Sequence, residues 1–355
     1  MKILIVRIGA MGDVLHAMPA VAALRAKYPR WFIGWAIEPR WSDLLQIAGD
    51  PQDLTQGVVV AGGAIARNGM VDRWYSVPAA AWSKQPLAGA TRTDIAALRR
   101  GLRYERFDLC VDLQGAVKSA VLGKMSGAKL LAGAAEPRER IARRWYGKRV
   151  EVNAQHVVDQ ACELLGAAVG ETLAPAKVTL PMNEQAEHWA DEVVGEERFV
   201  LISPGGGWGA KVWPAERFGR VAAELARAAG IRTVVNASPG GSREADEVVA
   251  GSSGAARAVP CSVGQLIALA RRAEVVIGGD TGPLHLAAAL ERPVVGIYGP
   301  TDPARNGPYG TRMRVLRDAE SATSHKRRNE VEPAMLKISA EQVVAAAREL
   351  LDGIP

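Results

Sequence analysis

The sequence lacks the features that mark membrane-spanning, secreted and metal-binding chains. No apolar run reaches the length of about 18 residues that a membrane-crossing helix needs. Cysteine is scarce: Cys110, Cys162 and Cys261 are widely spaced and fit neither a disulfide framework nor a zinc pattern. The opening segment MKILIVRIGAMGDVLH meets a glycine-containing turn and Asp13, so it predicts a first β-strand instead of a signal peptide. These absences favour a reducing cytosol.

The composition is that of a globular protein with an excess of positive charge. Of 355 residues, 48% are apolar and 23% are charged, which excludes a wholly disordered, collagen-like or coiled-coil chain. At roughly 150 residues per domain, the length predicts two domains. The net charge of +6 and the isoelectric point near 9.3 favour an anionic partner, such as a phosphate, a nucleotide, a nucleic acid or an acidic membrane surface.

The positive charge is concentrated in two segments. Residues 138–149 (RERIARRWYGKR) carry six Arg or Lys residues against one Glu, and 326–328 form a second basic cluster. A solvated basic surface is an equally good interpretation of both segments. No zinc finger or other nucleic-acid-binding module accompanies them, so we expect no nucleic-acid partner.

Apolar runs that end in turns alternate with segments of helical spacing along the chain. The predicted strands are 3–7, 31–37, 58–60, 74–77, 108–112, 199–203, 231–236, 274–278 and 293–298. The predicted helices are 13–27, 93–103, 155–166, 215–229, 243–250, 263–272 and 283–290, with a further helix after 115 and a linker at 167–182. This alternation predicts two α/β, Rossmann-like halves with doubly wound parallel sheets. Such sheets bind ligands beyond the carboxyl ends of their strands, so we expect a site in a cleft between the halves.

The first glycine-containing turn is GAMGD, residues 9–13. It is not a complete G-x-G-x-x-G pattern, and no convincing acidic partner follows about 20 residues later, which weakens a nicotinamide site. Its two glycines allow a close backbone approach, and Asp13 follows them. Asp13 has two interpretations: an N-cap of the first helix, or a general base.

A second turn, IGGDTGPLH at 277–285, joins a buried strand to a helix. The free N–H groups and positive dipole end of that helix suit a diphosphate, and Pro283 fits the first helical turn. His285 lies on the first turn of that helix, close to any anion bound there, and Asp280 precedes the helix. The alternatives are a helix cap for Asp280 and an ordinary packed or exposed histidine for His285. The single Asp-Thr-Gly triplet does not indicate an aspartic protease, which needs a paired carboxylate in a mostly β fold.

Two further turns follow strands in the second half. Residues 203–214 (SPGGGWGAKVWP) are rich in glycine and carry Lys211, but they lack the G-K-[ST] ending of an ATP-hydrolysing loop. Lys211 is either a phosphate ligand or an exposed surface lysine. Glu244, in the turn at 236–244, either binds a ribose diol or merely occupies a first helical turn. Together the four turns predict a site for a nucleotide diphospho-compound.

Four segments resemble the lipopolysaccharide heptosyltransferases of glycosyltransferase family 9. They are MGDVLHAMPA (11–20), DLQGAVKSA (112–120), KVWP (211–214) and GDTGPLHLAAALERPVVGIYGPTDP (279–303). The resemblance covers nearly the whole chain, and MGDVLH together with YGPTDP is more similar to the heptosyltransferase I group than to the heptosyltransferase II group.

That resemblance implies a GT-B fold and a particular reaction. The implied domains are a Rossmann-like acceptor domain at 1–175, a Rossmann-like donor domain at 183–335 and a C-terminal helix at 336–355. The implied reaction moves L-glycero-D-manno-heptose from ADP-heptose, with inversion and without a metal cofactor, to a Kdo residue of the lipopolysaccharide inner core (Kdo-lipid A). An acceptor of this kind implies a cytoplasmic enzyme in peripheral contact with the anionic face of the inner membrane.

The resemblance also implies roles for single residues. Asp13 matches the catalytic base, and Lys211 matches the lysine that binds the donor phosphates. The other implied donor-binding residues are Gly206, Gly207, Glu244, Asp280, Thr281, Gly282 and His285. The family's arginine-rich acceptor loop is represented around 79–92 only by Lys84 and Arg92, so we expect Lys84 to bind the acceptor. We expect Arg143 and Arg144 of the basic stretch to hold the acceptor or the membrane surface by charge attraction.

Two alternatives to a heptosyltransferase stay open at this point. One is another GT-B enzyme that uses a different nucleotide sugar, including a sugar-nucleotide epimerase. The other is a nucleotide-binding or nucleic-acid-binding protein without catalytic activity. An epimerase needs no acceptor, and a binding protein releases no ADP.

Overall fold

The computed structural model divides the chain into two compact units, Met1–Pro181 and Met182–Pro355. The structure describes residues 1–45, 63–65, 69–324 and 330–353, without the side chains of 63–65. The predicted strand at 58–60 and the basic cluster at 326–328 lie outside the described residues. The expected cleft between the halves stays a prediction.

The first unit is built on a sheet of strand order β3-β4-β2-β1-β5-β6-β7. Its strands are β1 (Lys2–Val6), β2 (Phe32–Ile37), β3 (Gly63–Ile65), β4 (Arg73–Ser76), β5 (Leu109–Asp112), β6 (Leu130–Ala134) and β7 (Lys148–Val150). The pairing of β3 with β4 is antiparallel, whereas the central pairs are parallel, with Ile3 opposite Leu109 and Val6 opposite Asp112. The central strands are continuous apolar runs because helices cover both faces of the sheet.

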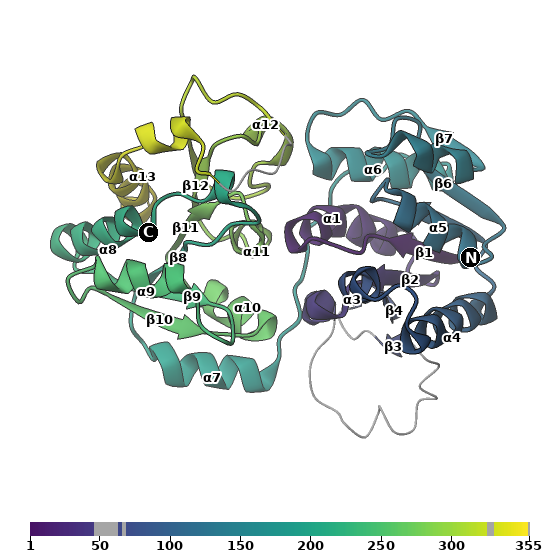
Figure 1. The fold of residues 1–355 in the computed structure, drawn as a ribbon, viewed down its shortest axis with the longest axis horizontal. Coiled ribbons are helices and arrows are strands. Elements are labelled where there is room, and N and C mark those ends of the chain that lie inside the picture. The colour runs from purple at the N-terminus through teal and green to yellow at the C-terminus, as the bar shows by residue number, and fades with distance from the viewer. Residues whose placement is uncertain (46–62, 66–68, 325–329, 354–355) are drawn as a thin grey trace. The chain divides into compact units, whose positions relative to one another are not determined.

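Helices pack against this sheet. They are α1 (Met11–Lys27), α3 (Ala79–Lys84), α4 (Gly89–Glu105), α5 (Val117–Met125) and α6 (Val157–Val169), with 3-10 helices η1 (Pro39–Leu44) and η2 (Arg140–Trp145). Helix α1 packs against α6, and α5 packs against η2 and α4 (Figure 1). Leu4, Val6, Leu102 and Phe107 belong to the buried core between the sheet and its helices.

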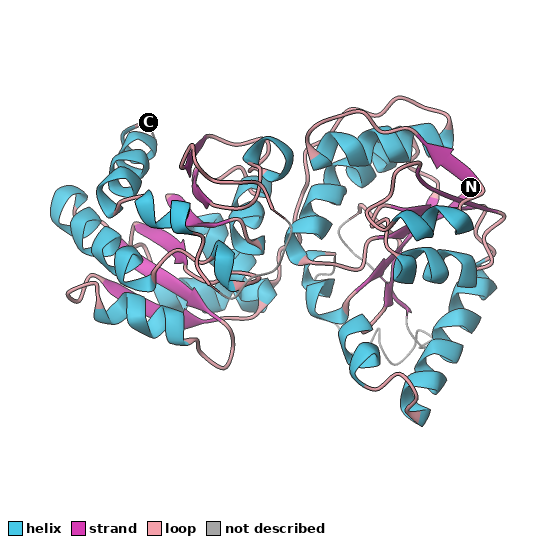
Figure 2. Cartoon of the chain, turned by 45° about the horizontal axis from the view of Figure 1, so that its top comes forward, coloured by secondary structure: helices cyan, strands magenta, loops and turns pink. Residues whose placement is uncertain are grey.

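The second unit is built on a sheet of strand order β10-β9-β8-β11-β12-β13, in which all pairs are parallel. Its strands are β8 (Phe199–Ser203), β9 (Arg232–Ala237), β10 (Ala256–Pro260), β11 (Val275–Gly279), β12 (Val294–Tyr298) and β13 (Met313–Arg317). Its helices are α7 (Glu184–Val194), α8 (Ala215–Ala229), α9 (Arg243–Ala250), α10 (Val263–Arg272), α11 (Gly282–Ala289), α12 (Pro303–Asn306) and α13 (Ala340–Asp352), with η3 (Gly209–Lys211) and η4 (Pro333–Lys337). Helix α8 packs against α9 and α13, and α10 packs against α7 and α11. In Figure 2 the strands of each unit run between its helices.

The predicted class, two Rossmann-like sheets, is confirmed, and helices α8, α9 and α10 have the predicted bounds. The antiparallel β3 corrects the expectation of a wholly parallel first sheet. The sequence analysis missed α3, α7, α12, β3, β6, β7, β10 and β13. Strands β10 (ARAVP) and β13 (MRVLR) lie at the sheet edges, where Arg and Pro residues interrupt the apolar pattern that identifies a buried strand.

Each sheet has one point at which the order of its connections reverses. In the first unit the chain steps from β1 outward through β2 to β4, and from β5 outward through β6 to β7. In the second unit the same reversal separates β8 from β11. The loops that leave the two central strands therefore part in opposite directions, and sheets of this kind bind ligands at such a reversal.

The helices are those of a chain without a long apolar run, and the three cysteines are unpaired. Within the part of the chain that the structure describes, every helix is too short or too polar to cross a bilayer. Cys110, Cys162 and Cys261 are free thiols, and all three are buried. Burial raises the pKa of the Cys261 thiol to about 12.

Helix α8 contacts the end of α9 closely at Gly219, and a substitution there tests the packing of the second unit. A Cβ added at Gly219 would lie 2.7 Å from the carbonyl carbon of Gly251 and 2.8 Å from the carbonyl oxygen of Val248. Alanine normally stabilises a helix interior relative to glycine by about 0.5–1 kcal/mol. Here we expect Gly219→Ala to lower the free energy of unfolding by about 1–2 kcal/mol, because overpacking against backbone costs more than the helix gains.

Urea unfolding measures this change, and Gly89→Ala is the matched control. Gly89 begins α4, and an added Cβ meets nothing within 4 Å. The control should unfold at the same urea concentration as the parent or at a slightly higher one. An unchanged midpoint for Gly219→Ala would show that α8 and α9 separate easily.

Candidate active site

Asp13 lies in the first turn of α1, which begins at Met11 and not at the predicted residue 13. Ala10 is the N-cap residue, so the N-cap interpretation of Asp13 is wrong. Instead, Asp13 Oδ2 accepts a hydrogen bond of 3.0 Å from the backbone N–H of Ala10. A carboxylate in the third position of a helix commonly satisfies this N–H. The side chain is 31% exposed, which leaves its carboxylate accessible to a substrate group.

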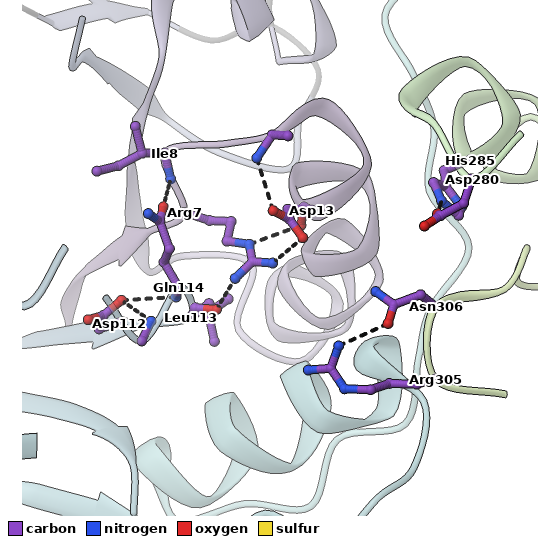
Figure 3. A network of polar contacts seen from close by, with 12 residues as sticks. Arg7, Ile8, Asp13, Asp112, Leu113, Gln114, Asp280, His285, Arg305 and Asn306 are labelled. Carbon is purple, nitrogen blue, oxygen red and sulfur yellow. Dashed lines mark hydrogen bonds and ion pairs between the residues drawn. The ribbon is translucent and has the colours of Figure 1, made fainter. Parts of the chain in front are cut away.

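Arg7, the residue after β1, holds Asp13 from the other side. Its Nη2 lies 2.7 Å from Asp13 Oδ1, and its Nε donates to the backbone carbonyl of Asp13 at 3.2 Å. Its Nη1 donates to the backbone carbonyl of Leu113 at 2.6 Å (Figure 3). The sequence analysis counted Arg7 as the end of a strand and gave it no role. The available signal was a cation directly after a buried apolar run and six residues before a carboxylate.

A buried carboxylate organises the loop after β5. Asp112 Oδ1 accepts from the backbone N–H groups of Gln114 and Gly115 at 2.9 and 3.0 Å. Asp112 Oδ2 accepts from the hydroxyls of Ser119 and Tyr146 at 2.9 and 2.7 Å. Burial raises the pKa of Asp112, and these hydrogen bonds oppose that increase. All four donors are neutral, so Asp112 acts as a structural anchor for the loop.

The loop after β5 is tied to the turn that carries Asp13. Gln114 Oε1 accepts from the backbone N–H of Ile8 at 2.9 Å (Figure 3). The backbone N–H of Leu113 donates to the carbonyl of Val6 at 3.1 Å. These bonds cross the point at which the strand order reverses, between β1 and β5. Neither Asp112 nor Gln114 was assigned a role from the sequence, although both lie in the segment 112–120 that carries the family resemblance.

In the second unit, the structure brings together three of the predicted donor-binding side chains. Asp280 follows β11, and its carboxylate pairs with the Lys211 ammonium through Oδ2 and with His285 Nε2 at 2.9 Å through Oδ1. Lys211, Asp280 and His285 have side chains that are 11%, 8% and 4% exposed. The interpretations of Lys211 as an exposed lysine and of Asp280 as a helix cap are therefore wrong.

The charges of this cluster fix the protonation state of its carboxylate. Burial alone would raise the pKa of Asp280, but the hydrogen bond and charge of His285 and the charge of Lys211 outweigh it and lower that pKa. The Lys211 ammonium also lies 4.2 Å from the ring centroid of Trp208, a cation–π contact. Trp208 lies in the glycine-rich segment quoted from the sequence, but no role was assigned to it. Asp280 and Trp208 thus hold the ammonium in place beside β11.

The backbone around the cluster shows which glycines leave open space. Thr281 is the N-cap residue of α11, which begins at Gly282, one residue before the predicted start; Pro283 lies in its first turn, as predicted. An added Cβ at Gly207 meets nothing within 4 Å, whereas one at Gly206 would lie 2.8 Å from Val212 Cγ2. A Cβ at Gly279 would lie 3.1 Å from the carbonyl oxygen of Lys211. A side chain at Gly206 or Gly279 would therefore require a neighbouring group to shift, whereas Gly207 leaves open space.

The remaining predicted site residues lie apart from these clusters. Glu244 is exposed in the first turn of α9, after β9, the strand next to β8. Lys84 ends α3, after β4, and the exposed Arg143 and Arg144 lie in η2, after β6. Four strand spacings, roughly 19 Å, separate β4 from β6. Arg143 Nη1 lies 3.2 Å from Glu136 Oε1, so part of the basic stretch is already paired.

Metal ligands are not grouped in the described residues. Over residues 1–45, 63–65, 69–324 and 330–353, no three His, Cys, Asp or Glu side chains are close enough together to hold one metal ion. The polar groups at the two strand reversals are instead carboxylates, cations and helix N-termini. Lys211 and the first turn of α11 match the chemistry of an anionic diphosphate.

Two Rossmann-like units, each with polar groups at its strand reversal, have the architecture of the GT-B fold. The sequence identifies the family: residues 95–335 match the model of glycosyltransferase family 9 (heptosyltransferase). The chain belongs to this family.

Individual relatives agree with the family assignment. Lipopolysaccharide heptosyltransferase 1 of Escherichia coli K12 is 26% identical over 322 residues, covering 89% of this chain and 93% of the relative. The enzyme of the same name from Pseudomonas aeruginosa is 27% identical over 314 residues, covering 87% and 82%. The E. coli heptosyltransferase WaaC solved with ADP is 24% identical, covers 99% of this chain and 100% of its own, and has a TM-score of 0.76, which shows a shared fold.

The lowered pKa of Asp280 predicts how stability depends on pH. Because the folded-state pKa lies below that of an unfolded aspartate, the ionised carboxylate contributes stability that is complete above about pH 4 and is lost as the pH falls toward the folded-state pKa. We expect Asp280→Asn to lower the free energy of unfolding by about 3 kcal/mol near pH 7, because the Lys211 ammonium loses its buried counter-charge.

Urea unfolding of the parent and the variant from about pH 7 to about pH 3 measures this dependence. The difference in free energy of unfolding between parent and variant should become smaller below about pH 4. Asp246→Asn, at an exposed position in the same unit, is the control and should change little at any pH. A difference that stays constant down to the lowest pH would contradict the ion-pair explanation.

Proposed function

We propose that this glycosyltransferase moves L-glycero-D-manno-heptose from ADP-heptose to a Kdo residue of the lipopolysaccharide inner core, with inversion at the anomeric carbon. The observation that carries the proposal is the buried cluster of Lys211, Asp280 and His285 beside the start of α11, at the strand reversal of the second unit. The family and the names of the relatives support the choice of sugar, as does a WaaC structure with ADP-2-deoxy-2-fluoro heptose.

In this proposal the second unit, 183–335 in the predicted bounds, binds the donor. Lys211 and the free N–H groups at the start of α11, including that of Gly282, bind the diphosphate and stabilise the negative charge of the leaving ADP. Because the Lys211 ammonium is already held, little further ordering is needed when the donor binds. Asp280 lies near the heptose, and Glu244 is proposed to bind the ribose. The glycine-rich loop that contains Gly207 lets the nucleotide approach the backbone.

Asp13 is the proposed catalytic base of the first unit, 1–175 in the predicted bounds. The acceptor hydroxyl oxygen forms a bond to the anomeric carbon of the heptose while the bond from that carbon to the ADP phosphate oxygen breaks. ADP leaves with the electron pair, and Asp13 takes the proton of the hydroxyl. The accessible carboxylate at the strand reversal between β1 and β5 supports this role.

The acceptor is proposed to be Kdo-lipid A, an anionic amphiphile at the cytoplasmic face of the inner membrane. Lys84, Arg143 and Arg144 are proposed to bind its charged groups, and the basic stretch 138–149 is proposed to give peripheral contact with the membrane. Exposure of Arg143 and Arg144 supports this assignment. No metal is proposed to take part, because Lys211 and the N-terminus of α11 supply positive charge at the leaving group.

A donor screen tests the proposed function. ADP-heptose, ADP-glucose, UDP-glucose and GDP-glucose are each supplied with a truncated Kdo-lipid, and nucleoside diphosphate release is measured with and without EDTA. Of the four donors, we expect only ADP-heptose to give nucleoside diphosphate release. This release should require the acceptor and should have the same rate in EDTA. Sugar conversion without acceptor would indicate an epimerase, and binding of ADP without release would indicate a binding protein. Loss of activity in EDTA that a divalent ion restores would contradict the role of Lys211.

Asp13→Asn tests the catalytic base. Asparagine can still accept from the N–H of Ala10, but it cannot take a proton and it loses the ion pair with Arg7. We expect a stability loss of about 1 kcal/mol or less, near-parental ADP binding, and a rate lower by about a hundredfold to ten-thousandfold. Melting, calorimetry with ADP and the release assay measure the three quantities. Transfer retained within about threefold would remove Asp13 from the mechanism and leave Asp280 as the next candidate.

Neutralising Arg143 and Arg144 together tests the acceptor site. The double Gln variant should raise the KM for the Kdo-lipid roughly tenfold and leave ADP affinity unchanged, because the lost attraction concerns the anionic acceptor. Arg99 and Arg100, exposed on α4 of the same unit, give a control of equal charge change and should leave both values unchanged. Equal losses for donor and acceptor would contradict the assignment.

A further inference from the structure

We propose that Arg7 is a positioning residue of the transfer reaction, which fixes the direction and the charge environment of the Asp13 carboxylate. The inference rests on the proposed role of Asp13 as the base. No motif in the sequence analysis pointed to Arg7, and the proposal comes from its contacts in the first unit.

Arg7 is itself held independently of the Asp13 side chain. Its Nε and Nη1 donate to the backbone carbonyls of Asp13 and Leu113, at 3.2 and 2.6 Å. These two acceptors belong to different segments, the start of α1 and the loop after β5. Leu113 is in turn fixed between Asp112 and Gln114, which hold the loop by their own hydrogen bonds. Arg7, only 15% exposed, therefore bridges the strand reversal between β1 and β5.

The third nitrogen of the guanidinium is left to face the carboxylate. Arg7 Nη2 lies 2.7 Å from Asp13 Oδ1, while the N–H of Ala10 holds Asp13 Oδ2 at 3.0 Å. With one donor on each oxygen, the carboxylate plane cannot turn freely, yet each oxygen keeps a lone pair for a substrate proton. A base held in one direction loses less rate to misorientation, since small displacements of a reacting group can cost up to about a hundredfold.

The planar fork of arginine is needed for this arrangement. One guanidinium reaches a carboxylate and two carbonyls at the same time because its donors point in fixed, coplanar directions. A lysine ammonium at residue 7 would keep the charge but would not hold the two carbonyls and the carboxylate together. Arg7→Met removes the charge and all three bonds, and Arg7→Lys removes only the fork.

We expect Arg7→Met to lower kcat by on the order of tenfold to a hundredfold with the KM for ADP-heptose within about threefold of the parent. Arg7→Lys should fall between the parent and Arg7→Met. If Arg7→Met melts below the assay temperature, Arg7→Lys carries the test: a kcat reduced by more than about threefold supports the proposal, and a full kcat overturns it.

Arg25 provides the matched control within the same unit. It lies in the last turn of α1, is 16% exposed, pairs with Asp72 at 2.5 Å and donates to the carbonyls of Pro29 and Trp31 at 2.9 and 2.8 Å. Its Nε also donates to the carbonyl of Met70 at 3.2 Å, so Arg25→Met removes at least as many bonds as Arg7→Met, away from Asp13. We expect it to lower the melting temperature and leave kcat unchanged. A drop in kcat for Arg25→Met equal to that for Arg7→Met would show a general effect of lost stability and would overturn the proposal.

A double-mutant cycle with Asp13→Asn separates positioning from a merely structural role. If Arg7 acts through the carboxylate, adding Arg7→Met to Asp13→Asn should change the residual rate by less than about threefold. Effects of the two substitutions that multiply would overturn the proposal. The outcomes also separate it from the proposed function: transfer retained by Asp13→Asn contradicts the base itself, whereas transfer lost by Asp13→Asn but retained by Arg7→Met contradicts only the role of Arg7.

Discussion

The reversal of strand order within each sheet is the constraint on which the candidate site depends. Parallel strands place all their carboxyl ends on one edge, and crossovers that depart in opposite directions part the two central loops. In the first unit the loop after β1 leads into the first turn of α1 with Asp13, and the loop after β5 carries Gln114; in the second unit the loops after β8 and β11 carry Lys211 and Asp280. Residues that are distant in sequence become neighbours there, as Lys211 and Asp280 do, without any contribution from the outer strands.

Two buried carboxylates at these positions are stabilised in different ways, and the difference follows their chemistry. Asp112 receives only neutral donors, burial dominates, and its pKa is raised. Asp280 faces Lys211 and His285, and its pKa is lowered in spite of burial. A carboxylate among neutral donors can anchor a loop, whereas one between two basic side chains orders them beside a helix N-terminus. The second arrangement suits the charge that develops on a leaving diphosphate.

Backbone packing also decides which part of a glycine-rich turn is available to a ligand. An added Cβ at Gly279 would lie 3.1 Å from the carbonyl oxygen of Lys211, so this glycine lets the β8 loop approach β11 closely. Gly207 leaves open space. The same residue type thus has two roles within one unit, and only neighbouring chain segments distinguish them.

The sequence by itself determined the class of fold, most of the buried strands, the bounds of α8, α9 and α10, and the turns that carry Asp13, Lys211 and Asp280. These features depend on local patterns: apolar runs, helical spacing and glycine at strand ends. The tertiary structure alone decided that Ala10 is the N-cap, that Asp280 pairs with Lys211 and His285, and that Arg7 holds Asp13. It also decided the polar edge strands β10 and β13. These contacts join residues brought together by strand order, and a local pattern does not encode which side chain a distant loop will meet.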